Sequence, residues 1–369
     1  MVSESRIREM LARGPFALIG AGQLGRMALD LWPEGEPKPL FFVDSMKSGD
    51  YCGLPVYRLD GEIPGGVTYL MSALKMPPAT ALSIFERLGQ ADILTVYDFL
   101  EERIPAEFSN GWRKLDPDAA TMRKADIARA AYADDLSRLI HDCTVDWRYH
   151  RKLRLDYPIA PEEEKYNPAQ FGRGGRHYDL LIDCGSYNLG SVASLSRGDV
   201  SFARIAAFEP DPAAFAACEA ALASGKVSSP VKLYREALAD FDGEATFLAS
   251  GLFSARLIDP SYGDPRKINV PVRRLDSLMD ELLQGATPGS LDILLKLHVE
   301  GAEMPALKGA EALLAAGRVD VVVDLAHDEA SFLEVAAYLA GFGHFDVFLR
   351  SHALYGAGGT LFARYKDTA

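Results

Sequence analysis

The chain has 369 residues, a formal net charge of −13 and a hydrophobic share of 48%. This length is sufficient for two or three domains, and the composition is that of an ordinary soluble globular protein. The acidic balance argues against nucleic acid as a partner, because phosphate binding requires basic patches. No apolar run reaches the roughly 18 residues of a membrane span, and the charged N-terminus is unlike a signal peptide. We therefore expect a cytoplasmic protein without a membrane span.

The cysteines show no paired spacing that would indicate a disulfide framework or a zinc site. They are Cys52, Cys143, Cys184 and Cys218. The sequence leaves the oligomeric state open, and a homo-oligomer is among the assemblies we consider.

Residues 1–14 read as a short amphipathic helix, and the next segment alternates strands and helices. A strand leads into a turn with Gly20, Gly22 and Gly25 and a helix, and a second strand ends at Asp44. A dinucleotide-binding turn has this order, with phosphate at the helix N-terminus and the acid on a ribose. The alternation continues through a strand at 67–74, a helix at 77–89 and a strand at 91–100. A second nucleotide site and a purely structural use of the glycines both fit this pattern.

Residues 106–165 have apolar positions at helical spacing and predict helices that bridge two α/β domains. Prolines then break the chain before the next strand. Three aromatic residues fall in or beside this break, and we expect them to pack between domains: Tyr157, Tyr166 and Phe171.

The run from Tyr178 to Ile182 reads as a strand buried on both faces, and it leads into Asp183 and a glycine-containing turn. A second strand ends at Glu209. Ligands of open parallel sheets bind beyond the carboxyl ends of the strands. Asp183, the turn after it and Glu209 therefore mark the predicted ligand site, in which Glu209 is suited to accept two ribose hydroxyls.

The remaining elements continue to the end of the chain. A helix after 270–274 is expected to be capped by Asp276 or Ser277. The other predictions are strands at 231–238, 242–250, 291–299 and 319–325, a helix ending at 314, and an antiparallel hairpin at 345–365.

Several ordered motifs resemble the FkbM family of S-adenosylmethionine-dependent methyltransferases. They are IDCGSYNLG, AFEPDP, EALADFDGEATF, VRRLDSL, KLHVEGAEMPALKGAEALL and VVVDLAH. The resemblance covers residues 166–369. It implies a Rossmann-like, seven-stranded methyltransferase sheet, mostly parallel with a C-terminal antiparallel hairpin. A smaller parallel α/β nucleotide-binding-like domain at 1–105 and a helical connector at 106–165 would precede it.

The resemblance implies S-adenosylmethionine as cofactor. Asp183 would attract its ammonium, the turn N–H groups its carboxylate, Glu209 the ribose and Glu236-Ala237 the adenine. The residues predicted to bind the cofactor are Asp183, Gly185, Ser186, Tyr187, Asn188, Gly190, Glu209, Pro210, Asp211, Glu236, Ala237 and Lys296.

An alcohol acceptor must lose a proton, and a histidine can take one near neutral pH. His298 at a strand end is the leading base, with Glu300 and His327 beside it and His352 as a weaker candidate. The sequence departs from the family at His298, where Asp is usual, and at Leu189, which reads as an insertion. His298, Glu300, Asp324 and His327 suit a metal chemically, but their spacing does not establish convergence. No metal is predicted.

The expected reaction is O-methylation of a sugar, a glycan or a related natural product, so the partner is a small-molecule or glycan acceptor. Two other classes stay open. One is an NAD-dependent oxidoreductase that uses Gly20–Gly25. The other is a non-catalytic nucleotide-sugar-binding module with a degenerate methyltransferase domain.

Overall fold

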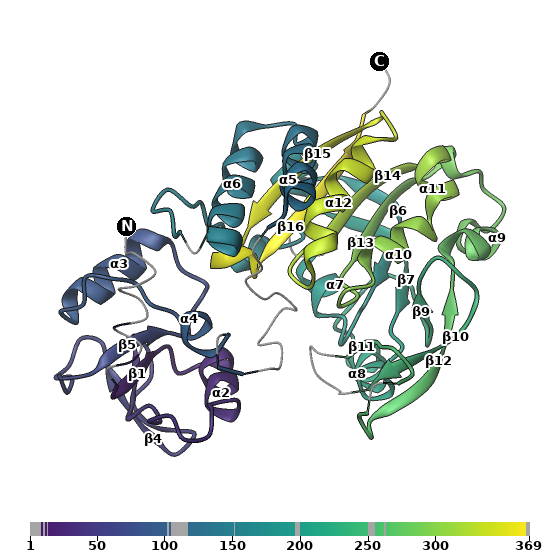
Figure 1. The fold of residues 1–369 in the computed structure, drawn as a ribbon. Coiled ribbons are helices and arrows are strands. Elements are labelled where there is room, and N and C mark those ends of the chain that lie inside the picture. The colour runs from purple at the N-terminus through teal and green to yellow at the C-terminus, as the bar shows by residue number, and fades with distance from the viewer. Residues whose placement is uncertain are drawn as a thin grey trace. The chain divides into compact units, whose positions relative to one another are not determined.

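The computed structural model (Figure 1) describes residues 9, 12, 14–101, 103–104, 117–150, 152–195, 200–249, 255–261 and 263–366. They form two compact units, each built from separate segments. Unit 1 holds residues up to 117 with 142–159 and 353–357, and unit 2 holds 118–141, 160–352 and the rest. The helix expected at 1–14 falls outside the described residues apart from isolated positions, as does the boundary at 105. The three predicted domains therefore stay a prediction.

Unit 1 contains a five-stranded sheet in the order β3-β4-β2-β1-β5. The pairs of β1 with β2, β1 with β5 and β2 with β4 are parallel, as predicted, while β3 and β4 form an antiparallel hairpin that was not predicted. Its elements are β1 (Phe16–Ile19), α2 (Gln23–Asp30), β2 (Phe42–Asp44), β3 (Gly49–Tyr51), β4 (Leu54–Arg58), β5 (Thr68–Met71) and α3 (Pro78–Arg87).

The strand predicted at 91–100 is wrong, because this segment forms the short helix α4 (Val96–Leu100). Thr95 and Asp98 make a capping box: the Thr95 hydroxyl accepts the Asp98 N–H, and the Asp98 carboxylate accepts the Thr95 N–H. These bonds satisfy donors that a helix start leaves open. Local capping thus outweighs the β-forming character of the sequence.

Replacing Thr95 with alanine is expected to destabilise unit 1 by about 1 kcal/mol, because the cap hydroxyl is lost from a buried position. Urea unfolding followed by circular dichroism measures this loss. Thr80→Ala is the matched control, since Thr80 is exposed in the first turn of α3. An unshifted transition in Thr95→Ala would show that the capping box contributes nothing.

Unit 2 is built on a seven-stranded sheet in the order β15-β16-β14-β13-β6-β7-β8. The five strands from β14 to β8 are parallel, and β16 runs antiparallel to both β14 and β15. This confirms the predicted fold class. The strands are β6 (His177–Cys184), β7 (Ser201–Phe208), β8 (Val231–Tyr234), β13 (Asp292–Leu297), β14 (Arg318–Asp324), β15 (Phe345–Ser351) and β16 (Gly359–Tyr365).

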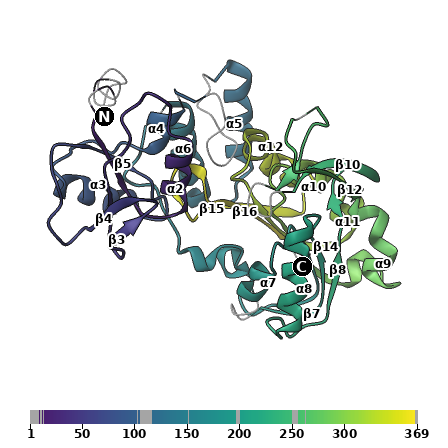
Figure 2. The same cartoon turned by 90° about the horizontal axis from the view of Figure 1, so that it is seen from below.

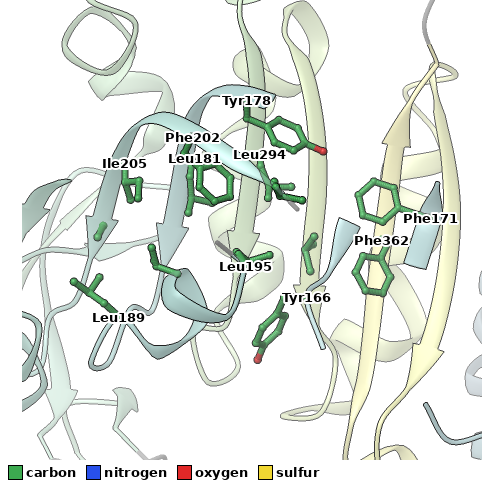
Figure 3. Packing of buried hydrophobic residues seen from close by; sticks show 14 of the residues in the cluster. Tyr166, Phe171, Tyr178, Leu181, Leu189, Leu195, Phe202, Ile205, Leu294 and Phe362 are labelled. Atoms are coloured by element: carbon green, nitrogen blue, oxygen red, sulfur yellow. The ribbon is translucent and has the colours of Figure 1, made fainter. Parts of the chain in front are cut away.

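The core of this sheet forms because the central strands are apolar on both faces. Leu181 in β6 and Leu294 in β13 are fully buried in one cluster that extends to Phe202 of β7 and Phe362 of β16. Figure 3 shows these side chains packed across the strands. From β6 the chain proceeds to β7 and β8 on one side and later returns to β13 on the other. The carboxyl ends of β6 and β13 therefore lie at a topological switch point.

Helices cover this sheet. The helix α5 packs on α12, and α10 and α11 lie beside α12 and β14 (Figure 2). The helix α12 was not predicted, although Asp328 caps it. The α-helices are α5 (Ala119–Ala131), α6 (Asp135–His150), α7 (Gly190–Leu195), α8 (Pro212–Ala223), α9 (Met279–Leu283), α10 (Glu303–Lys308), α11 (Glu311–Ala316) and α12 (Glu329–Ala340). Short 3-10 helices occupy Glu162–Glu164, Pro168–Phe171, Leu275–Leu278, Pro288–Ser290 and Leu354–Gly356.

The strand predicted at 231–238 is two strands in different sheets. The first is β8, and the second is β9 (Ala237–Leu238), which pairs in parallel with β12. A four-stranded sheet of order β11-β10-β12-β9 results, with β10 (Gly243–Leu248), β11 (Arg256–Leu257) and β12 (Lys267–Arg273).

The predicted cap at Asp276 or Ser277 is also wrong. The helix α9 begins at Met279, after Leu278, without a side-chain cap. The Asp276 carboxylate instead accepts the N–H groups of Ala312 and Leu313 in the first turn of α11. A residue that looked like a local cap therefore serves a helix more than thirty positions away in sequence.

All four cysteines are free thiols, as expected. Within the described residues, no helix combines the length and the apolar character needed to cross a bilayer.

Candidate active site

The predicted site residues of unit 2 converge at the carboxyl edge of the seven-stranded sheet. Asp183 lies near the end of β6, Glu209 follows β7, His298 follows β13, and Asp324 ends β14. The order of the strands makes these four positions neighbours along one edge.

The turn after β6 is held close to the end of β13. The His298 N–H donates to the Cys184 carbonyl at 3.0 Å. Gly185 has φ of +78°, and a Cβ there would lie 1.9 Å from the His298 carbonyl oxygen. Glycine is thus required by the approach of two strand ends, and His298 adjoins the turn directly.

The rest of the turn is shaped by two residues in the left-handed region, Tyr187 and Leu189, with φ of +52° and +58°. Leu189, the position that reads as an insertion, is fully buried in the core. The turn N–H groups of Gly185, Ser186, Tyr187, Leu189 and Gly190 all donate within the protein. A ligand carboxylate would have to displace such bonds, because this conformation already uses those donors.

Asp183 is completely buried and pairs with Lys296, whose Nζ lies 2.8 Å from its Oδ1. Lys296 is 1% exposed in its side chain and also donates to the Gly185 carbonyl at 2.8 Å. Ser191 Oγ approaches the other oxygen of Asp183. Asp183 therefore has an internal cation as partner, and Lys296 holds the β6 turn onto β13.

Glu209 braces the same turn from the β7 side. Its two carboxylate oxygens accept the N–H groups of Tyr187 at 2.8 Å and Asp211 at 2.9 Å. Burial raises the pKa of Glu209, and these two bonds oppose that shift. Asp211, after Pro210, caps α8 through its own carboxylate. Each Glu209 oxygen keeps acceptor capacity beyond its single backbone bond.

Glu236 and Ala237 lie at the point where the chain passes from β8 into β9. Among the described residues, the Glu236 Oε2 atom is buried and has no hydrogen-bond partner. A buried acceptor of this kind is unusual unless a ligand or water satisfies it.

His298, Glu300 and His327 form a compact group beside the turn. The Nε2 atom of His298 lies 3.1 Å from Glu300 Oε1, and that of His327 lies 3.4 Å from Glu300 Oε2. The two rings stack with centroids 4.8 Å apart. The predicted grouping of these three residues is thus present, although β13 ends at Leu297 and Glu300 adopts φ of +54° rather than a strand conformation.

The charges of this group are strongly coupled. Burial opposes ionisation of Glu300, but the imidazoles of His327 and His298 lower its pKa to about 2. Burial also disfavours the His327 cation, yet Glu303 and Glu300 raise the His327 pKa well above its usual range. For Asp324, Lys165 and the two histidines outweigh burial and depress the pKa.

Lys165 was not predicted as a site residue, and for Tyr166 the favoured expectation was packing between domains over a place above the substrate. Tyr166 lies in the core of unit 2, and its hydroxyl lies 2.6 Å from His298 Nδ1 and 3.2 Å from Asp324 Oδ2. Lys165 Nζ contacts the same Asp324 oxygen at 2.7 Å. No local motif marks this pair, because it lies more than a hundred residues before its partners.

Glu303 and His352 also have structural partners. The Glu303 carboxylate accepts the N–H groups of Val299 and Gly301 in the turn before α10. Its Oε1 atom also lies 2.9 Å from His327 Nδ1. His352 is buried with its Nδ1 near the Pro161 carbonyl, and burial lowers its pKa.

The family model described as the methyltransferase FkbM domain matches residues 155–352 of this chain. The chain belongs to the FkbM methyltransferase family. A solved FkbM methyltransferase from Methylobacillus flagellatus KT is similar over 97% of this chain and 92% of its own, with 17% identity and a TM-score of 0.65. The unit 1 sheet is therefore part of a fold already seen in this family.

Two further solved structures are more remotely similar to this chain. An O-methyltransferase from Bacillus cereus in complex with SAH has 14% identity and a TM-score of 0.34, over 68% of this chain and 93% of its own. The O-methyltransferase TomG from Streptomyces achromogenes, in complex with SAM, has 14% identity and a TM-score of 0.34, over 67% of this chain and 96% of its own. No curated protein matches this chain.

The methyl donor of this FkbM methyltransferase is S-adenosylmethionine. The chain's own residues fit that group. Glu209 offers two buried acceptor oxygens at the carboxyl end of β7, where a ribose diol is expected. The unsatisfied Glu236 Oε2 has the acceptor chemistry that an adenine amino group requires of a partner.

The glycine turn of unit 1 is the other site that the sequence suggested. The Asp44 carboxylate accepts the N–H groups of Ala21, Met46 and Lys47. Burial raises the pKa of Asp44, but these bonds outweigh burial and the pKa is lowered. A Cβ on Gly25 would lie 2.7 Å from the Gly20 carbonyl oxygen. These contacts account for Gly25 and Asp44 structurally, and a nucleotide at this turn stays a prediction.

Proposed function

We propose that this FkbM-family enzyme methylates a hydroxyl oxygen of a sugar, a glycan or a related natural product. The observation that carries the proposal is the position of the group formed by His298, Glu300 and His327. The main-chain N–H of His298 donates to the Cys184 carbonyl at the end of β6, within the Asp183–Gly190 turn. A proton acceptor thus adjoins the turn expected to hold the methyl donor. Oxygen acceptors require such a group, because an alcohol is a poor nucleophile until its proton leaves.

In this proposal the residues that would hold the cofactor follow β8, β7 and β6 at the carboxyl edge of the sheet. Glu236 and Ala237 would receive the adenine, Glu209 would accept the ribose hydroxyls, and the Gly185–Gly190 turn would contact the methionine end. When bound, S-adenosylmethionine supplies an electrophilic methyl group. Asp183 is already neutralised by Lys296, so the pair orients the turn, and the cofactor's charged groups rely on other contacts.

In the proposed step the acceptor hydroxyl takes the place of Glu300 at His298 Nε2, and its proton passes to that nitrogen while the Nε2 proton is held by Glu300. Before that step Nε2 faces Glu300, and Tyr166 fixes the opposite ring nitrogen. His327 orients Glu300 from its other oxygen. The side chains of His298 and Glu300 are 24% and 21% exposed, so an acceptor can reach this group from solvent.

The acceptor class is tested by following S-adenosylhomocysteine release with panels of glycosides, phenols and amines. Methylation of glycoside hydroxyls, located by mass spectrometry, is the expected result. Methylation restricted to amines would overturn the assignment of an oxygen acceptor.

Replacing Glu209 with glutamine is expected to weaken S-adenosylhomocysteine binding by about 10- to 100-fold, because one charge-assisted acceptor per ribose is lost. The glutamine side chain also places its N–H₂ group opposite the main-chain N–H of Tyr187 or Asp211, so one of these two hydrogen bonds is lost. Isothermal calorimetry measures the change, with Glu219→Gln as a control at an exposed position of the neighbouring α8. Equal affinities for the two variants would remove Glu209 from the cofactor site.

A further inference from the structure

We propose that His298, Glu300 and His327 bind a divalent transition-metal ion. One ligand atom from each residue lies within 4.8 Å of the others. Glu300 Oε1 lies 3.1 Å from His298 Nε2, and Glu300 Oε2 lies 3.4 Å from His327 Nε2. Ligands at about 2.0–2.1 Å from an ion are themselves separated by about 3 Å or slightly more. Each histidine is thus already spaced from Glu300 as two ligands of one ion are spaced from each other.

The outer partners of both histidines support the same assignment. Metal-bound histidines usually engage their second ring nitrogen with a carboxylate or another polar group, which fixes ring orientation. Here Glu303 Oε1 lies 2.9 Å from His327 Nδ1, and the Tyr166 hydroxyl lies 2.6 Å from His298 Nδ1. Both rings therefore turn Nε2 toward Glu300. A simple ion pair would not require two rings to be oriented in this way.

The surroundings favour a cation. Glu300, Glu303 and Asp324 bring three carboxylates to the group, and Lys165 pairs with Asp324. Glu300 also has φ of +54°, a conformation that a non-glycine residue adopts at a cost. This backbone conformation brings the Glu300 carboxylate to the Nε2 atoms of both rings. A strained backbone at a residue with such contacts is expected where function requires the geometry.

The identity of the ligands limits the ion. Two imidazoles and one carboxylate suit zinc, iron, cobalt, nickel or manganese, whereas magnesium prefers oxygen ligands. Three protein ligands leave open coordination positions, and the partial exposure of His298 and Glu300 gives them access to solvent. The acceptor class that fits is one with a hydroxyl, or two adjacent hydroxyls, able to coordinate the ion.

The role in catalysis rests on the proposed O-methylation, whereas the ion binding itself does not. A bound divalent ion lowers the pKa of a coordinated oxygen and fixes its direction. The ion would then replace His298 as the group that activates the acceptor hydroxyl. The histidines would serve as its ligands.

The test is calorimetric titration of the full chain with Co²⁺ alone, after treatment with a chelator and its removal by gel filtration. The visible spectrum of bound Co²⁺ reports its nitrogen and oxygen ligands independently of activity. One ion per chain is expected. His327→Ala and Glu300→Gln should each weaken binding by more than about 10-fold, since loss of an outer partner alone costs that much. His177→Ala is the matched control, because His177 is exposed at the opposite end of β6.

Glu303→Gln should weaken binding by about 10-fold, through the loss of its hold on His327. Circular dichroism of each variant separates loss of binding from loss of fold. Absence of Co²⁺ binding by the folded wild type, or binding that Glu300→Gln leaves unchanged, would overturn the proposal. S-adenosylhomocysteine binding by the metal-free protein tests the cofactor site separately, so failure of one proposal is distinguishable from failure of the other.

Discussion

Lys296→Met is expected to lower the free energy of unfolding of unit 2 by about 3–5 kcal/mol. The Lys296 ammonium is the partner of a completely buried Asp183 carboxylate, and the methionine leaves that charge without compensation. It also removes the donor to the Gly185 carbonyl, which ties the turn to β13. Urea unfolding followed by circular dichroism gives the change. S-adenosylhomocysteine binding should weaken with it, because the turn loses its anchor.

Two comparisons make this result specific. Lys232→Met removes an exposed partner of Glu281 and should leave the unfolding transition nearly unchanged. The double variant Asp183→Asn, Lys296→Met should recover part of the loss, since an amide replaces the unpaired charge. A single variant as stable as the wild type would mean that Asp183 is neutral or solvated in the folded protein.

His298→Ala is expected to lower kcat by about 10²- to 10⁴-fold with the preferred hydroxyl acceptor, the usual contribution of a group that accepts a proton. Its affinity for S-adenosylhomocysteine should stay at the wild-type value, because the contact of His298 with the turn is made by its main chain. Single-turnover measurements at saturating acceptor isolate this step. His177→Ala again serves as the matched variant.

The same measurement separates the two roles open to His298. If the imidazole alone accepts the proton, chelated wild-type enzyme keeps its turnover, and added Zn²⁺ has no effect. If His298 binds a metal ion, chelation of the wild type reproduces the defect of His298→Ala, and Zn²⁺ restores only the wild type. Unchanged turnover of His298→Ala at saturating acceptor would remove the residue from both roles.

The sheet of unit 2 was predictable because its central strands are continuous apolar runs. Such runs form where both faces of a parallel strand are buried, so β6, β7, β13 and β14 could be located from the sequence alone. The placement of Asp183, Glu209 and His298 at one edge then follows, since the carboxyl ends of parallel strands share that edge. Their neighbours along the edge depend on strand order, which local patterns do not specify.

Elements decided by a side-chain cap or a distant partner were harder to predict. The segment before α4 is rich in β-forming residues, and only the reciprocal bonds of Thr95 and Asp98 make it helical. Asp276 has the features of a local cap, yet its partners are in α11. Tyr166 reaches His298 across 132 positions of sequence. Long-range contacts of this kind are a product of topology, and a single sequence carries no periodic signal for them.

Glu303 couples the conformation of the loop after His298 to the orientation of His327, two features that a redesign would need to vary separately. One carboxylate fixes the loop from Val299 to Gly301 and also sets the orientation of His327. Redesign of that loop for a new acceptor would therefore also disturb the orientation of His327. Attempts to broaden the range of compounds that this enzyme alkylates should begin elsewhere along the rim and keep position 303 intact.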